Sequence, residues 1–327
     1  MKLKTIILLL FAGGFLLTAC QKNTDIFVPD PGQTNGPDTS WQTTITAAMP
    51  VSILKRNLLP EPYVDSFIVS ANIATVITPS GLQINFSPNS CVNSIGQPIT
   101  GRVQVEIVLV KKKGDMIRLN LPTTYNDSLL VAAGHIFIKL MKNGQPVFLA
   151  PTARINIRYI DLPTNPAMNF FVGDETNPQR FNWLPNPDVA NNIVIAGTQS
   201  YEIYTNRLRW ISIAYAFDFN TAAKVNVAAG LVNYFTNANT VAFTVLKDFR
   251  SVAAMHGDLS TRKFISGKIP VGKNITVVVI SKQGNDYYLG YETAVTQSTI
   301  PTNTSQVVHI TPIKKSITEI LLYLSSL

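Results

Sequence analysis

The chain has few of the residues from which catalytic and metal sites are built. Its 327 residues include three His and two Cys, and only 14% of them are charged. The sequence contains no H-E-x-x-H, C-x-x-C or G-x-S-x-G motif and no phosphate-binding glycine loop. We therefore expect a protein that is not an enzyme and that uses no cofactor and no metal.

One group of residues keeps a catalytic alternative open. His256, Asp258 and Asp248 lie close together in the sequence, but no nucleophile accompanies them, and a surface turn explains them more simply. His135 shares a strand face with Phe137, which favours a structural role. We expect no catalytic residue in this chain.

The N-terminus has the three parts of a secretory signal. Lys2 and Lys4 precede an apolar stretch at residues 6–17, and residues 16–20 read LLTAC. About 12 apolar residues are too few for the ~20 that a membrane-spanning helix needs. The run that ends in Cys20 resembles a bacterial lipobox, which implies cleavage after residue 19 and lipidation of Cys20. Cys91 would then have no disulfide partner within the mature chain.

This resemblance implies a location as well as an anchor. The residues after Cys20 have no Asp at the second position, which favours the outer membrane, with the cell surface slightly preferred to the periplasmic face. The expected partners are the membrane, through the N-terminal lipid, and an envelope protein or glycan. Loss of Lys2 and Lys4 lowers the formal charge from +8 to +6, a mild excess in a chain for which we expect no nucleic-acid partner.

Residues 20–44 are rich in Pro, Gly, Asp, Thr and Asn, which predicts a flexible tether. Trp41 is its one large aromatic residue. We expect this ring to dock on the first domain, with a position at the lipid interface as the alternative.

Beyond the tether, apolar and polar residues alternate with a period of two. Examples are Val103, Val105 and Ile107, which are separated by polar residues, and the pattern recurs through the chain. Turn sequences separate these runs, including Asn143-Gly144 and Gly284-Asn285. The sequence predicts an all-β fold with two antiparallel β-sandwich domains in tandem and a short C-terminal helix.

Four segments of the first half resemble the ZU5-type β-sandwich. They are residues 78–86 (TPSGLQINF), 96–103 (GQPITGRV), 122–123 (PT) and 129–134 (LLVAAG). The resemblance covers about a quarter of the chain and implies an interaction module. Some relatives cleave themselves at a His-Phe-Ser junction, but the residues that follow the three His here are Ile136, Gly257 and Ile310. Self-cleavage by that route is therefore not expected.

These patterns give a domain plan. We expect the ZU5-like sandwich at residues 45–165, a connector at 166–207, and a second sandwich with the C-terminal helix at 208–327. Residues 269–273 (IPVGK) resemble the entry to a central strand in transthyretin-like and immunoglobulin-like modules, and the tandem resembles Bacteroidota lipoproteins. Ser316 and Glu319 form an S-x-x-E capping box at the start of the helix.

Two sets of residues are candidates for a binding surface. Lys111, Lys112 and Lys113 form a basic run at an expected hairpin tip, in a segment with eleven Lys or Arg and six Asp or Glu between residues 45 and 161. A solvated turn would show the same run. Trp183 and Trp210, with neighbouring Phe residues, could form a stacking platform, or they could pack between the two domains, which is the reading we favour.

Taken together, these features favour a lipid-anchored, non-catalytic binding or scaffolding module of the outer envelope. The alternatives are a glycan-binding surface protein or adhesin and, less favoured, an enzyme acting on polysaccharide. A glycan binder should expose aromatic side chains on a flat face, and a glycosidase needs two carboxyl groups that converge in a cleft.

Overall fold

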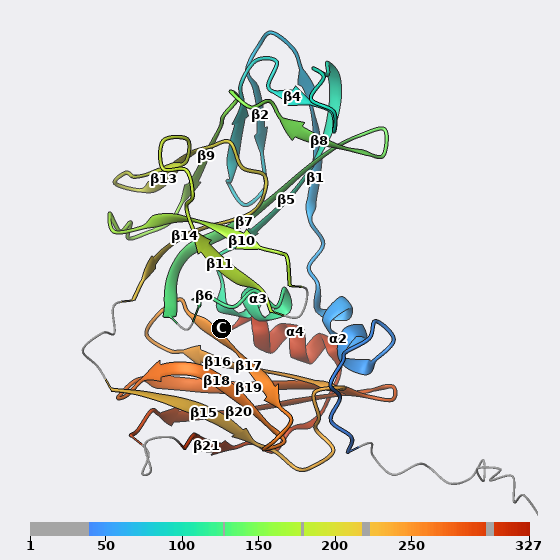
Figure 1. Cartoon of the computed structure of the whole chain (residues 1–327), viewed down its shortest axis with the longest axis vertical. Helices are drawn as coiled ribbons and strands as arrows, with labels where there is room; N and C mark the ends of the chain where they lie inside the picture. The colour runs from blue at the N-terminus through green and yellow to red at the C-terminus, as the bar shows by residue number, and fades with distance from the viewer. Residues whose placement is uncertain (1–38, 127, 178–179, 218–222, 299–303) are drawn as a thin grey trace, which may run out of the picture. The chain divides into compact units, whose positions relative to one another are not determined.

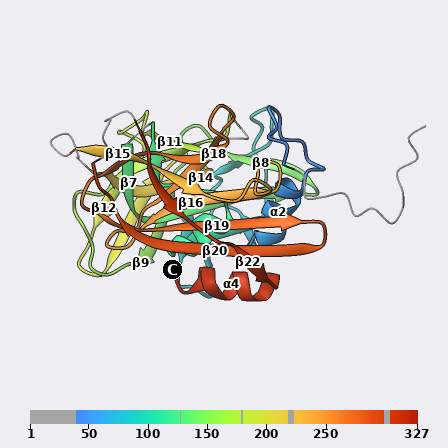
Figure 2. The ribbon, with the colours of Figure 1, turned by 90° about the horizontal axis from the view of Figure 1, so that it is seen from below.

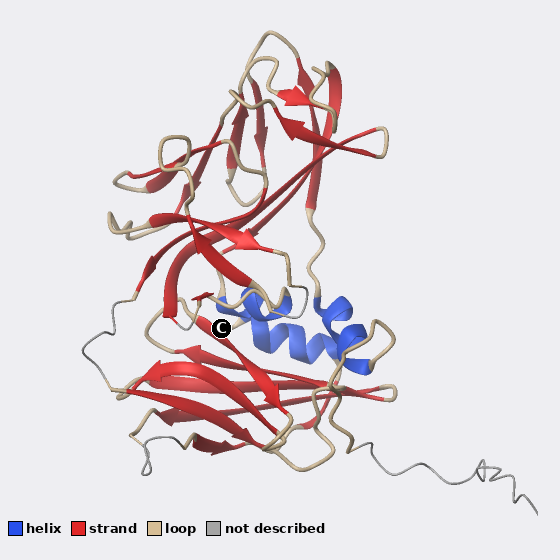
Figure 3. Cartoon of the chain, in the orientation of Figure 1, coloured by secondary structure: helices blue, strands red, loops and turns tan. Residues whose placement is uncertain are grey.

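The computed structural model describes residues 39–126, 128–177, 180–217, 223–298 and 304–327 (Figure 1). The expected signal peptide, Cys20 and most of the expected tether lie outside the described residues. The described part of the chain is mostly β-strand, with antiparallel sheets and a short C-terminal helix (Figure 3). The predicted all-β class is confirmed.

The first half of the chain builds two sheets. In the larger one the strand order is β1-β5-β7-β14-β10-β11, and β4, β6 and β8 attach beside this path. The bounds are β1 (Tyr63–Val69), β4 (Cys91–Val92), β5 (Gly101–Val110), β6 (Thr124–Tyr125), β7 (Ser128–Lys142), β8 (Gln145–Leu149), β10 (Asn169–Asp174), β11 (Asn182–Pro185) and β14 (Arg209–Ala216). The smaller sheet has the order β12-β13-β9-β3-β2. Its strands are β2 (Ala74–Ile77), β3 (Gln83–Phe86), β9 (Ile155–Ile160), β12 (Ile193–Ala196) and β13 (Ser200–Thr205).

These two sheets bury one hydrophobic cluster between them. On β5, Val103, Val105 and Ile107 all point into it, which is the face that the alternating pattern predicts. Ile84 from β3 and Ile157 from β9 enter the same cluster from the smaller sheet. The expected turn at Asn143-Gly144 joins β7 to β8, and both residues have positive φ, as a two-residue hairpin turn requires.

The domain boundaries expected at 166–207 and 208 do not match the sheets. The expected connector contains β10, β11, β12 and β13, which pair with strands of the first half. The segment expected to open the second sandwich is β14, and it pairs along β7. Sequence-adjacent strands need not be neighbours in a sheet, and here β14 joins a strand some seventy residues earlier. The first half therefore extends to Ala216.

The second half is built on one sheet with the strand order β21-β15-β18-β17-β16-β19-β20-β22. Its strands are β15 (Lys224–Gly230), β16 (Thr240–Leu246), β17 (Val252–Asp258), β18 (Lys263–Pro270), β19 (Asn274–Gln283), β20 (Asp286–Val295), β21 (Gln306–His309) and β22 (Ile313–Lys315). The pair β15–β21 is parallel, whereas the other pairs are antiparallel. Gly284-Asn285 forms the tight turn between β19 and β20, as expected.

Both faces of this sheet are covered, so β16 is buried along its whole length. On one face Ala242 and Leu246 join a cluster with Val277 and Phe264. On the other face Phe243 joins a second cluster, which also takes side chains from three helices and from the first half. This second cluster, called the junction core below, explains why the described residues form one compact unit.

The three helices of the described residues are α2 (Pro50–Leu58), α3 (Lys113–Arg118) and α4 (Ile317–Ser325). Each contributes apolar side chains to the junction core, among them Leu54, Met116 and Leu324. The capping box expected at Ser316 and Glu319 is present at the start of α4. Figure 2 shows α4 beside β20 and β22, where the rings of Tyr323 and Tyr291 stack 4.4 Å apart.

Candidate functional site

The three lysines proposed as a binding surface do not lie at a hairpin tip. β5 ends at Val110, and the chain then turns into α3. The Lys111 ammonium lies 3.2 Å from the carboxylate of Asp161, and Lys113 donates to the carbonyl of Leu246 at 2.8 Å. Lys112 donates to the carbonyl of Ser325 at 3.3 Å. These side chains hold α3 against its neighbours, and the expected hairpin tip is wrong.

The two tryptophans proposed as a stacking platform are buried. Trp183 is 0% exposed and Trp210 is 9% exposed, and both belong to the junction core. The Trp183 indole donates to the carbonyl of Pro122 at 2.9 Å, and its ring stacks on His135 at 4.6 Å. Both rings lie in the junction core, but their direct ring contacts, with His135, Phe137 and Phe181, are all within the first half. They offer no open aromatic face to a ligand.

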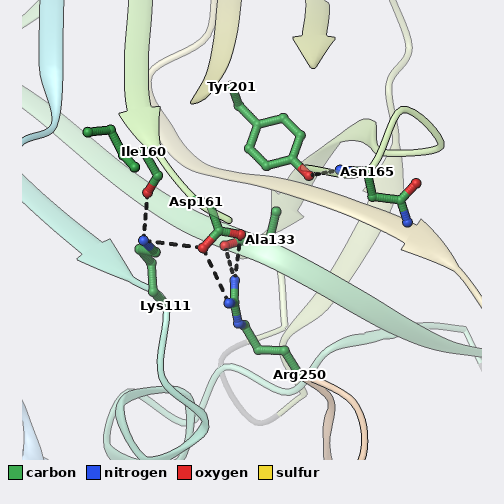
Figure 4. Close-up of polar contacts among 7 residues, drawn as sticks. All are labelled: Lys111, Ala133, Ile160, Asp161, Asn165, Tyr201 and Arg250. Carbon is green, nitrogen blue, oxygen red and sulfur yellow. Dashed lines mark hydrogen bonds and ion pairs between the residues drawn. The ribbon is translucent and has the colours of Figure 1, made fainter. Parts of the chain in front are cut away.

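A buried ion-pair group also joins the two halves (Figure 4). Asp161 follows β9 in the first half, and the Arg250 guanidinium reaches it from the turn between β16 and β17, with N–O distances of 3.0 and 3.3 Å. Arg250 also donates to the carbonyl of Ala133, and the Lys111 ammonium contacts the same Asp161 carboxylate. Each charge here has a partner inside the fold. The group therefore stabilises the contact between the two halves and is not an open binding site.

The suggested catalytic group is not assembled. His256 and Asp258 lie on β17, and the Asp258 carboxylate accepts hydrogen bonds from Ser260 and Thr261. Among the described residues, neither Asp258 nor Asp248 makes a hydrogen bond to His256. The hydroxyl and amide donors lower the pKa of Asp258, because they stabilise the carboxylate.

His256 does lie at a hollow region of the described surface that involves both halves. Two cavities, of about 500 and 990 Å³, adjoin along β17 and share His256, Arg180, Phe181 and Leu259 among their lining residues. Together we call them the β17 groove. The cavity of about 500 Å³ is the first cavity, and the cavity of about 990 Å³ is the second cavity.

Three parts of the chain form the groove. Strands β17 and β18 supply the floor, and one wall is supplied by Thr124 and Asn126 with Asn177, Arg180 and Phe181. The second wall, at the first cavity, is made by residues 42–47 and by α2, which contributes Lys55. The site therefore exists only when both halves and the N-terminal segment are in place.

The N-terminal wall is fixed by Trp41. Its ring lies 5.2 Å from that of Phe264, and the backbone of Gln42 exchanges two hydrogen bonds with the side-chain amide of Asn237. Gly257 makes room for the ring, since a Cβ there would lie 2.8 Å from Trp41. The predicted docking of Trp41 is correct, but the ring packs on the second half and not on the first domain. The expected tether boundary at residue 44 is thus too late.

Burial and hydrogen bonds shift the pKa values of several titratable groups of the groove. Desolvation, together with the charges of Arg180 and Lys55, lowers the pKa of His256 to about 4, which leaves the imidazole neutral near pH 7. Hydrogen bonds from Thr176 lower the pKa of Asp174, which lines the second cavity. A protonated carboxyl group suited to general-acid chemistry is absent from the described residues of the groove.

The described residues contain no group of three His, Cys, Asp or Glu that could hold a metal ion. Sequence reasoning singled out His256 but missed Lys55 and Arg180. A signal for Lys55 was available, because Pro50 opens a segment in which Val51, Leu54 and Leu58 have helical spacing. Arg180 lies in a loop, where no periodic pattern predicts its neighbours.

None of the helices in the described ranges is long and apolar enough to cross a membrane. No protein-family model matches the chain, and no curated protein matches its sequence. A function has to be argued from the groove itself.

Proposed function

We propose that the chain is a non-catalytic binding or scaffolding module, anchored to the outer envelope by lipid on Cys20, that holds a protein partner in the β17 groove. The observation that carries the proposal is the groove itself, which has a large volume and a lining of both polar and apolar side chains. A lipid anchor would keep this groove at the membrane, where a partner in the same envelope could reach it.

Two further observations support binding of a protein over stacking of a sugar. Trp183 and Trp210 are buried, and Phe181 packs edge-on against both rings at 4.9 and 6.5 Å. Sugar-binding faces commonly use an exposed aromatic ring, and the described lining of the groove presents no such pair of rings. Amide side chains of Asn182 and Asn226 line the second cavity, where a peptide backbone needs donors and acceptors.

The groove is tested by crosslinking in cells. A photoreactive benzoylphenylalanine replaces Leu259, which lines both cavities, and a matched control replaces Thr293, an exposed residue of β20 that lines neither cavity. We expect a discrete protein adduct from position 259 and none from position 293. The same adducts from both positions, or none, would contradict the proposal, and a glycan adduct would replace the protein partner.

The anchor is tested separately with a Cys20→Ser variant. We expect the wild-type chain to sediment with the membranes and the variant to be released into the soluble fraction. Protease treatment of intact cells then distinguishes the cell surface, where the chain is digested, from the periplasmic face, where it is protected. A variant that remains with the membranes would count against lipidation at Cys20.

A further inference from the structure

The first cavity of the groove carries positive charge that the fold does not neutralise. Lys55 and Arg180 line it, and none of its described lining residues is Asp or Glu. Neither cation forms an ion pair with any other residue in the ranges that the structure describes. By contrast Lys111, Arg118, Lys139, Arg209 and Arg250 all have carboxylate partners.

Burial makes the uncompensated charge of Lys55 costly, whereas Arg180 is exposed. Burial lowers the pKa of Lys55, because partial loss of water disfavours the ammonium form. The effect of both cations reaches His256, since Arg180 and Lys55 each add to the desolvation that keeps its imidazole neutral. An anion placed in this cavity would meet two cations and a neutral imidazole, with no described carboxylate of the lining to repel it.

The floor below the charges is partly apolar. Ala254, with Ile45 and Phe181 beside it, lines the first cavity and is half-buried, so a bound group would contact carbon as well as charge. The adjoining second cavity is lined by amides and hydroxyls, such as Asn226 and Ser266, and also by the carboxylates of Asp174 and Asp258. An occupant that fits the whole groove is therefore extended, with an anion and apolar side chains in the first cavity and hydrogen-bond donors in the second.

We infer that the partner presents an extended, acidic protein segment and that a carboxylate of this segment binds in the first cavity between Lys55 and Arg180. The inference rests on the proposed function, because it names the chemistry of the partner that the groove receives. Charge complementarity favours an acidic residue of the segment in the first cavity. The partly apolar floor of that cavity favours neighbouring residues such as Val or Leu.

The test compares two synthetic peptides on the chain from residue 21 onward, by isothermal titration at low salt. The acidic probe is N-acetyl Val-Glu-Val-Glu-Val amide, and its neutral counterpart has Gln in place of both Glu residues. A hydrogen-bonded contact to a charged group is worth enough to change affinity roughly tenfold or more. We expect the acidic peptide to bind at least about tenfold tighter than the neutral one, and the difference to shrink as salt is added.

Two variants test whether the preference for the acidic peptide arises from Lys55 and Arg180. Lys55→Met and Arg180→Met should each weaken binding of the acidic peptide roughly tenfold and leave the neutral peptide unchanged. The matched control is Lys224→Met, which removes an exposed lysine of β15 that lines neither cavity, and it should leave both affinities unchanged. Thermal unfolding of each variant checks that the fold is intact.

Three outcomes would overturn the inference. These are equal affinity for the two peptides, an acid preference that survives loss of Lys55 and Arg180, and binding of oligogalacturonate in the cavity without binding of the acidic peptide. If the inference fails while the photocrosslink at position 259 still captures a protein, the groove binds a partner of different charge and the proposed function stands. If both fail, the proposed function fails as well.

Discussion

Replacing Asp161 by Asn should weaken the ion pairs that join the two halves through Arg250. The Asp161 side chain is 8% exposed, whereas those of Arg250 and Lys111 are 31% and 35% exposed. Breaking a buried ion pair costs ~3–5 kcal/mol, and an exposed pair contributes ~0–1 kcal/mol. Because the carboxylate is buried and its two cations are partly hydrated, we expect the free energy of unfolding to fall by about 2–3 kcal/mol.

Urea unfolding of the chain from residue 21 onward, followed by tryptophan fluorescence, measures this loss, since Trp183 and Trp210 lie in the junction core. The control is Glu175→Gln, which breaks a bidentate pair with Arg209 whose side chains are 36% and 54% exposed. It should cost about 0.5 kcal/mol or less.

A loss for Asp161→Asn no larger than that of the control would refute the reasoning. So would a double variant, Asp161→Asn with Arg250→Met, whose loss equals the sum of the two single losses, because contacting partners should couple by ~0.5–3 kcal/mol.

Three further predictions concern other parts of the fold. Burial and the charge of Arg250 lower the pKa of His135 to about 3, so between pH 6.5 and 3 the unfolded chain binds a proton that the native chain does not. Stability should fall as the pH drops through this window, by up to ~1.4 kcal/mol per pH unit from this residue, and the decline should flatten in His135→Gln. Gly114→Ala would drive a methyl group into the backbone of Leu324 and should cost about 1–3 kcal/mol in thermal unfolding, whereas Gly267→Ala, in open space, should be tolerated. Ser316→Ala should cost about 1 kcal/mol in urea unfolding by removing the side-chain cap of α4, and an unchanged midpoint would show that the cap contributes nothing.

The sequence predicted the parts of the fold that depend on local pattern. Alternation identified β5 because every second residue faces the cluster between two sheets, and Asn143-Gly144 identified a turn because few residues other than Asn and Gly adopt positive φ easily. The capping box of α4 is likewise a local signal, because it depends on only two residues that lie three positions apart.

The parts that failed depend on contacts between distant segments. Alternation in β14 predicts a strand, but nothing in that segment says that it pairs with β7 and not with the strands after it. The run from Lys111 to Lys113 was expected at a hairpin tip, yet α3 begins at Lys113, and Gly114 packs against the backbone of Leu324 in α4. Of the groove, His256 was singled out from the sequence. Its position beside Lys55 of α2 and Arg180 depends on contacts between segments far apart in the chain, which a local sequence pattern does not show.

The docking of the first described residues on the last sheet has a consequence for the order of synthesis. Gln42 bonds to Asn237, 195 positions later, and the apolar face of α2 is covered by β16 and β19. A ribosome releases α2 long before either strand exists, so Val51, Leu54 and Leu58 have no native cover while the middle of the chain is made. Folding of this protein should therefore be completed only after nearly the whole chain has been released, and a nascent chain stalled before residue 240 should remain open to protease at its N-terminal end.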